Sequence, residues 1–149
     1  MLTMAESATQ TVTIAASPEH CFAVAIDFPR YPEWAKDVKE ATVRETDADG
    51  RPTQVEFRAS ALGRSTHYTL AYDYSAAPEK VSWHLVHGDI TKAIDGAYTF
   101  TPSTHEPGST DVVYELSIEL VVPLPGFVKR RAEVRILNTV KELKARAEA

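Results

Sequence analysis

Cysteine is nearly absent from this chain of 149 residues, which contains Cys21 alone. A single thiol cannot form an internal disulfide, so the sequence does not encode a small disulfide-stabilised domain. The same scarcity favours a reducing compartment, and we expect a cytoplasmic protein. Cys21 falls on the apolar side of an expected helix, where a free cysteine is usually part of the core. We therefore interpret Cys21 as a core residue and not as a nucleophile.

Long hydrophobic runs are also missing. The apolar runs extend over only a few residues, which excludes a membrane-spanning helix. The N-terminus has no basic region followed by an apolar segment, so we expect no signal peptide. Hydrophobic residues make up 44% of the chain and charged residues 25%, as in ordinary globular proteins. This length and composition predict a single domain over residues 1–149.

Basic residues are fewer than acidic ones, 16 against 21, so the formal net charge is −5. An acidic chain is unlike a nucleic-acid-binding protein, and we expect no nucleic-acid partner. Residues 125–149 nevertheless contain seven basic and three acidic residues, so this segment carries +4 and the remainder −9. The basic segment is either a solvated helix face or a surface for anionic lipid or an acidic partner. We expect a monomer or weak dimer with at most peripheral membrane contact through this segment.

Sequence motifs for several common chemistries are not found. The chain has no Gly-x-Ser-x-Gly elbow, no His-Glu-x-x-His stretch, no cysteine pair and no glycine-rich loop. His84 and His87 are three residues apart on an expected strand, so they point to opposite faces unless a bulge intervenes. We expect no metal site and no cofactor.

What the sequence does contain is a strong amphipathic pattern at its C-terminus. The breaker Pro123-Leu124-Pro125-Gly126 is followed by a segment without glycine or proline, which predicts a helix from about Phe127 to the end. Thr139 lies within the apolar stripe of this helix, which is formed by Val128, Ala132, Ile136, Val140, Leu143 and Ala147. Some twenty-two residues span roughly 33 Å, so the helix needs a broad apolar surface beside it.

The preceding residues predict that surface as a sheet. After a loose leader over residues 1–8, apolar and polar residues alternate in seven segments separated by turn residues. Ser17-Pro18-Glu19 predicts the start of a helix, and a second short helix is expected from Tyr31 to Trp34. The expected strands are Thr9–Ala15, Val38–Thr46, Thr53–Leu62, Ser65–Tyr74, Val81–His87, Ile90–Thr101 and Asp111–Val122. The order predicts an α+β fold with an antiparallel sheet.

This order and three local motifs resemble the helix-grip fold of the START and birch-pollen-allergen-like superfamily (SRPBCC). The motifs are Ser17-Pro18-Glu19, the segment from Asp27 to Trp34, and Gly96-Ala97-Tyr98-Thr99-Phe100-Thr101-Pro102. Within the superfamily the chain is similar to the polyketide cyclase/dehydrase and coenzyme Q-binding branch, over about residues 9–147. The resemblance implies a curved sheet of about seven strands that grips the C-terminal helix around an apolar cavity. Members bind lipids, polyketides, quinones, sterols or hormones, and a minority catalyse cyclisation or dehydration.

Aromatic side chains dominate the strand faces that we expect to point inward. Each one alone can simply fill the core, but together they predict a cavity with a few polar groups. The expected ligand-binding residues are Trp34, Tyr68, Tyr72, Trp83, Leu85, His87, Tyr98, Tyr114, Arg135 and Thr139. His87 is the single, weak candidate for an acid or base. Arg58 faces outward, and Asp27 and Asp95 would reach the interior only through a loop or a bulge.

Three functions remain open from the sequence. The first is a binding protein for a hydrophobic small molecule held between the sheet and the C-terminal helix. The second is a polyketide aromatase/cyclase or dehydratase that uses Tyr68, Tyr72 and His87. The third is a protein-interaction module with a filled core and no ligand. Turnover distinguishes the second from the first, and a hollow interior distinguishes both from the third.

Overall fold

The computed structural model describes residues 6–61, 64–121 and 126–149, and their side chains except at positions 6–7, 61, 126–134 and 136–137. Within these described ranges the chain forms seven strands, two α-helices and one 3₁₀ helix. In chain order the elements are β1 (Glu6–Ile14), α1 (Pro18–Ala25), η1 (Phe28–Glu33), β2 (Val38–Thr46), β3 (Pro52–Ala61), β4 (Arg64–Asp73), β5 (Lys80–Gly88), β6 (Thr91–Pro102), β7 (Thr110–Leu120) and α2 (Gly126–Glu148).

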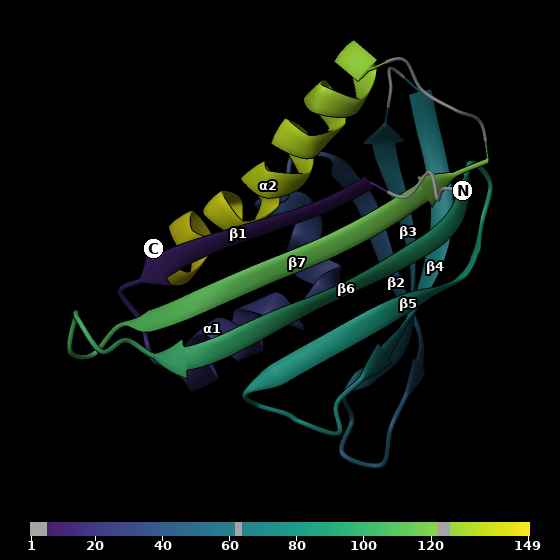
Figure 1. The fold of residues 1–149 in the computed structure, drawn as a ribbon. Coiled ribbons are helices and arrows are strands. Elements are labelled where there is room, and N and C mark those ends of the chain that lie inside the picture. Colours follow the sequence, from purple (N-terminus) through teal and green to yellow (C-terminus); the bar gives the residue numbers. More distant parts are fainter. Residues whose placement is uncertain (1–5, 62–63, 122–125) are drawn as a thin grey trace.

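The seven strands form one curved antiparallel sheet in the order β1-β7-β6-β5-β4-β3-β2, and α2 packs across it (Figure 1). Every neighbouring pair is antiparallel, and the first strand pairs with the last. The predicted order of strand, two short helices, six strands and one long helix is confirmed. The predicted helix-grip fold is therefore confirmed as well.

The first helix begins where the sequence predicts it. The Ser17 side chain accepts a hydrogen bond from the backbone N–H of His20 at 3.1 Å, and Pro18 occupies the first turn. The second short helix differs from the prediction, because η1 already begins at Phe28 and ends at Glu33. Pro29 stands in the first turn, where its missing N–H costs no hydrogen bond.

The N-terminal strand is longer than expected. We assigned residues 1–8 to a loose leader, but β1 begins at Glu6, and Ala8 pairs with Leu116 of β7. This part of the prediction is wrong for Glu6–Ala8. β7 continues alongside Glu6–Ala8 and pairs with their backbone groups. The strand therefore extends beyond the residues whose own sequence pattern predicts it.

The apolar stripe of α2 is buried as far as its side chains are described. Val140, Leu143 and Ala147 are at most 5% exposed and belong to the same core as Ile14 and Cys21. Cys21 is thus a core residue, as predicted. The side chains of Val128, Ala132 and Ile136, which the sequence places on the same stripe, lie outside the described residues.

Polar contacts along β1 and α1 hold the same flank of α2. The Lys144 ammonium donates to the carbonyl of Thr13 at 2.7 Å, and the backbone N–H of Ala15 donates to the Glu148 carboxylate at 2.8 Å. The His20 ring lies 3.1 Å from the carbonyl of Ala147. Within the described part of the chain, neither helix has the length and hydrophobicity needed to cross a bilayer.

Candidate functional site

An array of aromatic rings covers the inner face of the sheet. Tyr72 and Trp83 are opposite one another on β4 and β5, and their ring centroids are 5.8 Å apart. Trp83 contacts Tyr98 of β6 at 5.3 Å, and Tyr98 stacks on Tyr114 of β7 at 4.8 Å. These four residues were all predicted as ligand contacts from strand alternation, and the structure brings them together. Tyr68 joins the array through Phe57, at 5.3 Å.

A glycine makes room for the central indole. Gly96 of β6 is paired with Trp83, and a Cβ atom added at Gly96 would lie 2.5 Å from the indole ring. No real side chain tolerates that distance, so the ring lies directly over the backbone of β6. The Gly96-Ala97-Tyr98 motif therefore positions Trp83 within the array.

Burial along the inner face is uneven. Val55, Val81, Phe100 and Val112 on this face are at most 1% exposed. Elsewhere on the same face, residues of three strands are only half-buried although they pack against the core. These half-buried residues are Tyr68, Tyr72, Leu85, Leu116 and Ile118. Side chains that face the core and still keep accessible surface indicate that the described residues cover this part of the inner face less completely than the rest.

The phenol groups of the array are neutral. Burial raises the pKa of Tyr72 and Tyr98 well above the usual value, and burial together with the negative charge of Asp37 raises the pKa of Tyr68 to about 12. Among the described residues, the hydroxyls of Tyr68 and Tyr72 have no hydrogen-bond partner. Neutral phenols donate hydrogen bonds to an oxygen acceptor such as a carbonyl group, but they do not act as bases near pH 7.

Thr139 lies where the sequence predicts it, and Arg135 does not. Burial raises the pKa of Tyr114, while the Thr139 hydroxyl of α2 opposes that rise, which puts the half-buried Thr139 near the array. Arg135 instead binds Asp37, with its Nε 3.2 Å from the carboxylate, and its side chain is 63% exposed. The Arg135 side chain therefore points to the exposed side of α2, where the carboxylate of Asp37, just before β2, holds it.

The predicted inward position of His87 is wrong. Leu70 pairs with Leu85, but Thr69 pairs with His87, so β5 contains one extra residue at this point. This β-bulge moves His87 to the outer face, where it is exposed, and brings Gly88 opposite Tyr68. A Cβ at position 88 would lie 2.2 Å from Thr91 Oγ1, so a larger residue there would have to displace the Thr91 side chain. Regular alternation would have required His87 to occupy that space.

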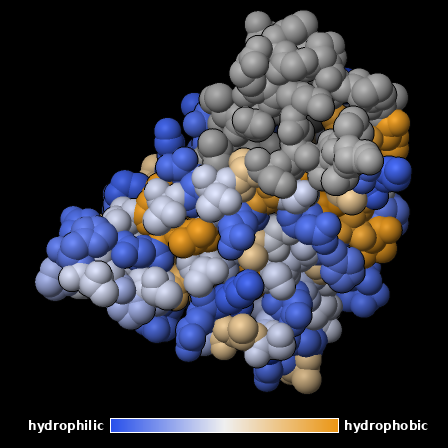
Figure 2. Space-filling view, viewed as in Figure 1, coloured by the Kyte–Doolittle hydropathy of each residue, from blue (hydrophilic) through white to orange (hydrophobic). Residues whose placement is uncertain are grey.

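The outer face of the sheet is ionic. The bulge places His84 and His87 on the same face, whereas regular alternation would point them apart. Arg58 pairs with Glu40, and Asp95 is opposite His84, both on this face. Figure 2 shows small hydrophobic patches separated by hydrophilic residues on the side in view. No three His, Cys, Asp or Glu side chains of the described residues are arranged to hold a metal ion.

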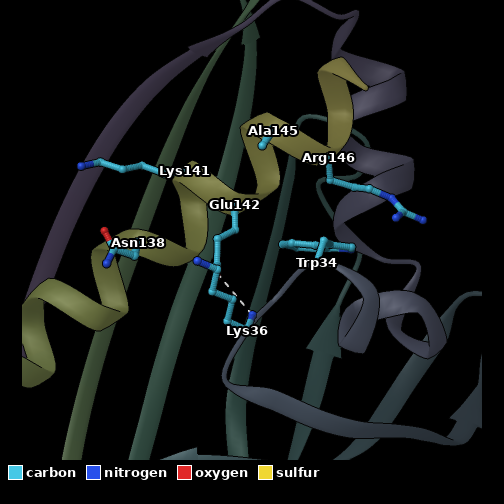
Figure 3. Close-up of a pocket in the computed structure, with 7 residues that line it drawn as sticks. All are labelled: Trp34, Lys36, Asn138, Lys141, Glu142, Ala145 and Arg146. Atoms are coloured by element: carbon cyan, nitrogen blue, oxygen red, sulfur yellow. Dashed lines mark hydrogen bonds between the residues drawn. The ribbon is translucent and has the colours of Figure 1, made fainter.

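A second, open site lies on the flank of α2 that faces away from β1. It is a cleft of about 520 Å³ between α2 and the segment that follows η1 (Figure 3). Trp34 and Lys36 form one wall of this cleft. The opposite wall is formed by Asn138, Lys141, Glu142, Ala145 and Arg146 of α2. The volume is typical of a small-molecule site.

Polar contacts bridge the cleft to the rest of the fold. The backbone N–H of Lys36 donates to the Glu142 carboxylate at 3.3 Å, in the middle of the cleft (Figure 3). The Arg146 guanidinium donates to Glu33 of η1 at 2.8 Å, and this ion pair lowers the pKa of Glu33. Together with the pair between Arg135 and Asp37, these contacts connect α2 to residues 33–37.

Sequence reasoning found only one wall of the cleft, at Trp34. The residues that it missed on α2 lie beside the apolar stripe, and Asn138, Glu142 and Ala145 recur at helical spacing. That spacing was visible in the sequence, but a polar stripe on a helix usually faces only solvent. The neighbouring segment that turns this stripe into a cleft is distant in sequence.

The family comparison agrees with this architecture. The sequence profile of the family described as polyketide cyclase/dehydrase and lipid transport matches residues 5–148. The chain belongs to this family. No protein with a curated description matches the sequence.

Solved structures place this member of the polyketide cyclase/dehydrase and lipid transport family among START-like proteins. A START superfamily protein from Mycobacterium smegmatis superposes with a TM-score of 0.85 at 29% identity, covering 95% of this chain and 97% of the other. The Zhui aromatase/cyclase from Streptomyces sp. R1128 gives a TM-score of 0.75 at 16% identity, covering 97% and 94%. Ginseng major latex-like protein 151 from Panax ginseng gives 0.67 at 11%, covering 98% and 99%. The last two similarities show the shared fold.

Proposed function

We propose that the protein binds an apolar or aromatic small molecule between the inner face of the sheet and α2. The observation that carries this proposal is the partial exposure of Tyr68, Tyr72, Leu85, Leu116 and Ile118 on a face that otherwise belongs to the core. Apolar surface with a few unengaged polar groups is the usual composition of a small-molecule site. The neutral hydroxyls of Tyr68 and Tyr72 would orient a ligand that carries an oxygen acceptor.

The family supports the chemical class of the ligand. Its description combines polyketide cyclisation with lipid transport, so polyketide-like, isoprenoid or lipid molecules are the ligands that we expect. We further propose a cytoplasmic location, which suits the single buried cysteine, and a monomer or weak dimer. Hydrophobic small molecules are the partners of the interior, and neither a metal nor a cofactor has a role in this proposal.

The alternative of a cyclase or dehydratase has less support. Such an enzyme must remove a proton next to a carbonyl group and stabilise the resulting charge. The phenols of the array can polarise a carbonyl, but the described inner face contributes neither an imidazole nor a carboxylate, since His87 and Asp95 face outward. The interaction-module alternative requires a filled core, which the half-buried rings argue against.

A matched pair of probes tests the proposal. Menadione is a flat bicyclic molecule with two carbonyl oxygens, and 2-methylnaphthalene has almost the same shape without them. Both should bind saturably at one site and change the fluorescence of Trp83. Tyr68→Phe and Tyr72→Phe should each weaken menadione binding about fivefold, the effect of one hydrogen bond of about 1 kcal/mol, and leave 2-methylnaphthalene unaffected.

Tyr74→Phe is the control, because the Tyr74 hydroxyl already donates to the carbonyl of Pro52. This variant should lose stability and keep its affinity for menadione. Absence of saturable binding for both probes would contradict the proposal. Multiple turnover of a poly-β-ketone substrate, followed by mass spectrometry, would establish the enzyme instead.

A further inference from the structure

The cleft beside Trp34 has a charge unlike that of the protein as a whole. The chain carries a net −5, whereas the cleft is lined by Lys36, Lys141 and Arg146 and by one carboxylate, Glu142. Arg146 is paired with Glu33, and Glu142 accepts a hydrogen bond from a backbone N–H. Among the described residues, the ammonium groups of Lys36 and Lys141 have no ion-pair partner. A locally cationic cleft on an acidic protein selects for anions.

The cleft also has an apolar wall. The ring of Trp34 is half-buried and lies beneath Ala145 and Arg146, so the small side chain of Ala145 leaves space above the indole (Figure 3). Lys36 and Glu142 lie beside each other between Trp34 and Asn138, while the ammonium end of Lys141 projects from the helix on the side away from Trp34 (Figure 3). An indole surface next to ammonium groups suits a ligand in which an apolar group adjoins a negative charge.

The cleft adjoins the interior through two connections. Trp34 contacts Tyr31 at 4.6 Å, Tyr31 contacts Phe57 at 6.1 Å, and Phe57 stacks on Tyr68 of the array. Asp37, the residue after Lys36, lies close enough to Tyr68 for its charge to raise the pKa of that phenol. One continuous wall of aromatic rings therefore extends from the cleft to the inner face of the sheet.

We propose that the cleft receives the anionic end, a carboxylate or a phosphate, of an amphiphilic small molecule whose apolar body lies against the inner face. This inference rests on the proposed function and names its ligand class. Lys36 contacts the anion, Lys141 contributes positive charge from a greater distance, and Trp34 packs against the adjoining apolar segment. An uncharged ligand of the same size occupies the interior without using the cleft.

The two tryptophans of the chain are separate reporters for the two sites, since Trp34 lines the cleft and Trp83 lies in the array. The probes are dodecanol, dodecanoate and dodecyl phosphate, which share an alkyl chain and differ in the end group. Each is titrated into the full-length protein below its micelle concentration, while the two indole N–H signals are followed by NMR. Trp34→Phe assigns the signals.

All three probes should shift the Trp83 signal, and only the two anions should shift the Trp34 signal. Dodecanoate should bind about five- to tenfold more tightly than dodecanol at low salt, as expected for a charge-assisted hydrogen bond that is partly exposed. The phosphate and carboxylate arms distinguish the preferred anion by their relative affinities. The Lys36→Met/Lys141→Met double variant should bind all three probes with equal affinity, and its affinity for dodecanol should equal that of the wild type.

Lys80→Met is the matched control, because Lys80 is an exposed lysine at the start of β5 and does not line the cleft. It should retain the preference for anions. Shifts of Trp83 with all three probes, combined with equal affinities and no shift of Trp34, would overturn the inference and leave the proposed function standing. Absence of any Trp83 shift would overturn both.

Discussion

The two flanks of α2 meet the rest of the protein in different ways. Toward β1 and α1, the helix buries Val140, Leu143 and Ala147 and adds short hydrogen bonds to the backbone of β1. Toward residues 33–37, its contacts are exposed polar side chains on either side of an open cleft. The first flank fixes the helix to the sheet, and the second leaves space between two walls. One side of α2 thus contributes to the stability of the fold, and the opposite side lines the cleft.

The largest expected difference comes from placing an aspartate on each flank. Leu143→Asp buries a carboxylate in the core without a partner, and it should cost about 4 kcal/mol or more of the 5–15 kcal/mol typical of a domain. Ala145→Asp, on the exposed cleft flank, should change stability by no more than about 0.5 kcal/mol. Urea unfolding followed by circular dichroism measures both. Equal losses would show that the flanks do not differ.

Smaller effects are expected from removing one cation on each flank. Lys144→Met removes a hydrogen bond to the Thr13 carbonyl and an ion pair with Glu148, and it should cost about 1 kcal/mol. Arg146→Met removes an ion pair with Glu33 but no hydrogen bond to a strand carbonyl, and it should cost less than about 0.5 kcal/mol. The same unfolding assay compares the two. A larger loss of unfolding free energy for Arg146→Met than for Lys144→Met would show that the cleft flank contributes more to stability than the β1 flank.

The carboxylates on the two flanks should titrate independently. Lys144 and the backbone N–H of Ala15 lower the pKa of Glu148, and Arg146 lowers the pKa of Glu33, in both cases below the ordinary value of 4.5. A lowered carboxyl pKa gives stability that is complete above 4.5 and is lost as the pH falls through the folded-state pKa. Acid should therefore weaken both attachments only below pH 4.5.

Carboxyl NMR titration of the cation variants separates the two groups. Lys144→Met should raise the pKa of Glu148 toward 4.5 and leave Glu33 unchanged, while Arg146→Met should do the reverse. A shift of both carboxyls in either variant would indicate that the flanks respond as one unit.

The smallest expected effect is that of salt. At 1 M NaCl the screening length is about 3 Å, so exposed ion pairs weaken while buried apolar contacts do not. Hydrogen exchange of the Trp34 indole N–H should accelerate by roughly twofold, because local opening on the cleft flank becomes easier. Exchange at Trp83 should remain unchanged. Acceleration at Trp83 as well would place the salt-sensitive contacts in the core.

The fold was predictable because its signals are local and repeated. Alternation set the seven strands, the spacing of Val140, Leu143 and Ala147 set the buried side of the last helix, and Ser17-Pro18 set the start of α1. The tyrosines of the array followed from the same alternation. Each of these inferences depends on residues within one element, where sequence and geometry are directly related.

The remaining features depend on distant partners. Arg135 turns outward because Asp37, 98 residues earlier, holds it. The cleft exists only because Trp34 and Lys36 lie across from α2. His87 faces outward because β5 accommodates an extra residue next to Thr69, and the adjacent Gly88 is read from the sequence as the end of the strand as easily as a bulge. Contacts of this kind become visible only when the strands and helices are assembled.

The bulge in β5 has an evolutionary consequence. Because side chains alternate along a strand, a change of one residue in strand length exchanges the inner and outer positions beyond it. Gly88 faces the interior here only because β5 holds one residue more than its partner. In a descendant that lost Gly88, His87 would take the inner position next to Tyr68 once Thr91 had become smaller. Insertion or deletion of one residue in β5 therefore changes the chemistry of the interior as much as a substitution does.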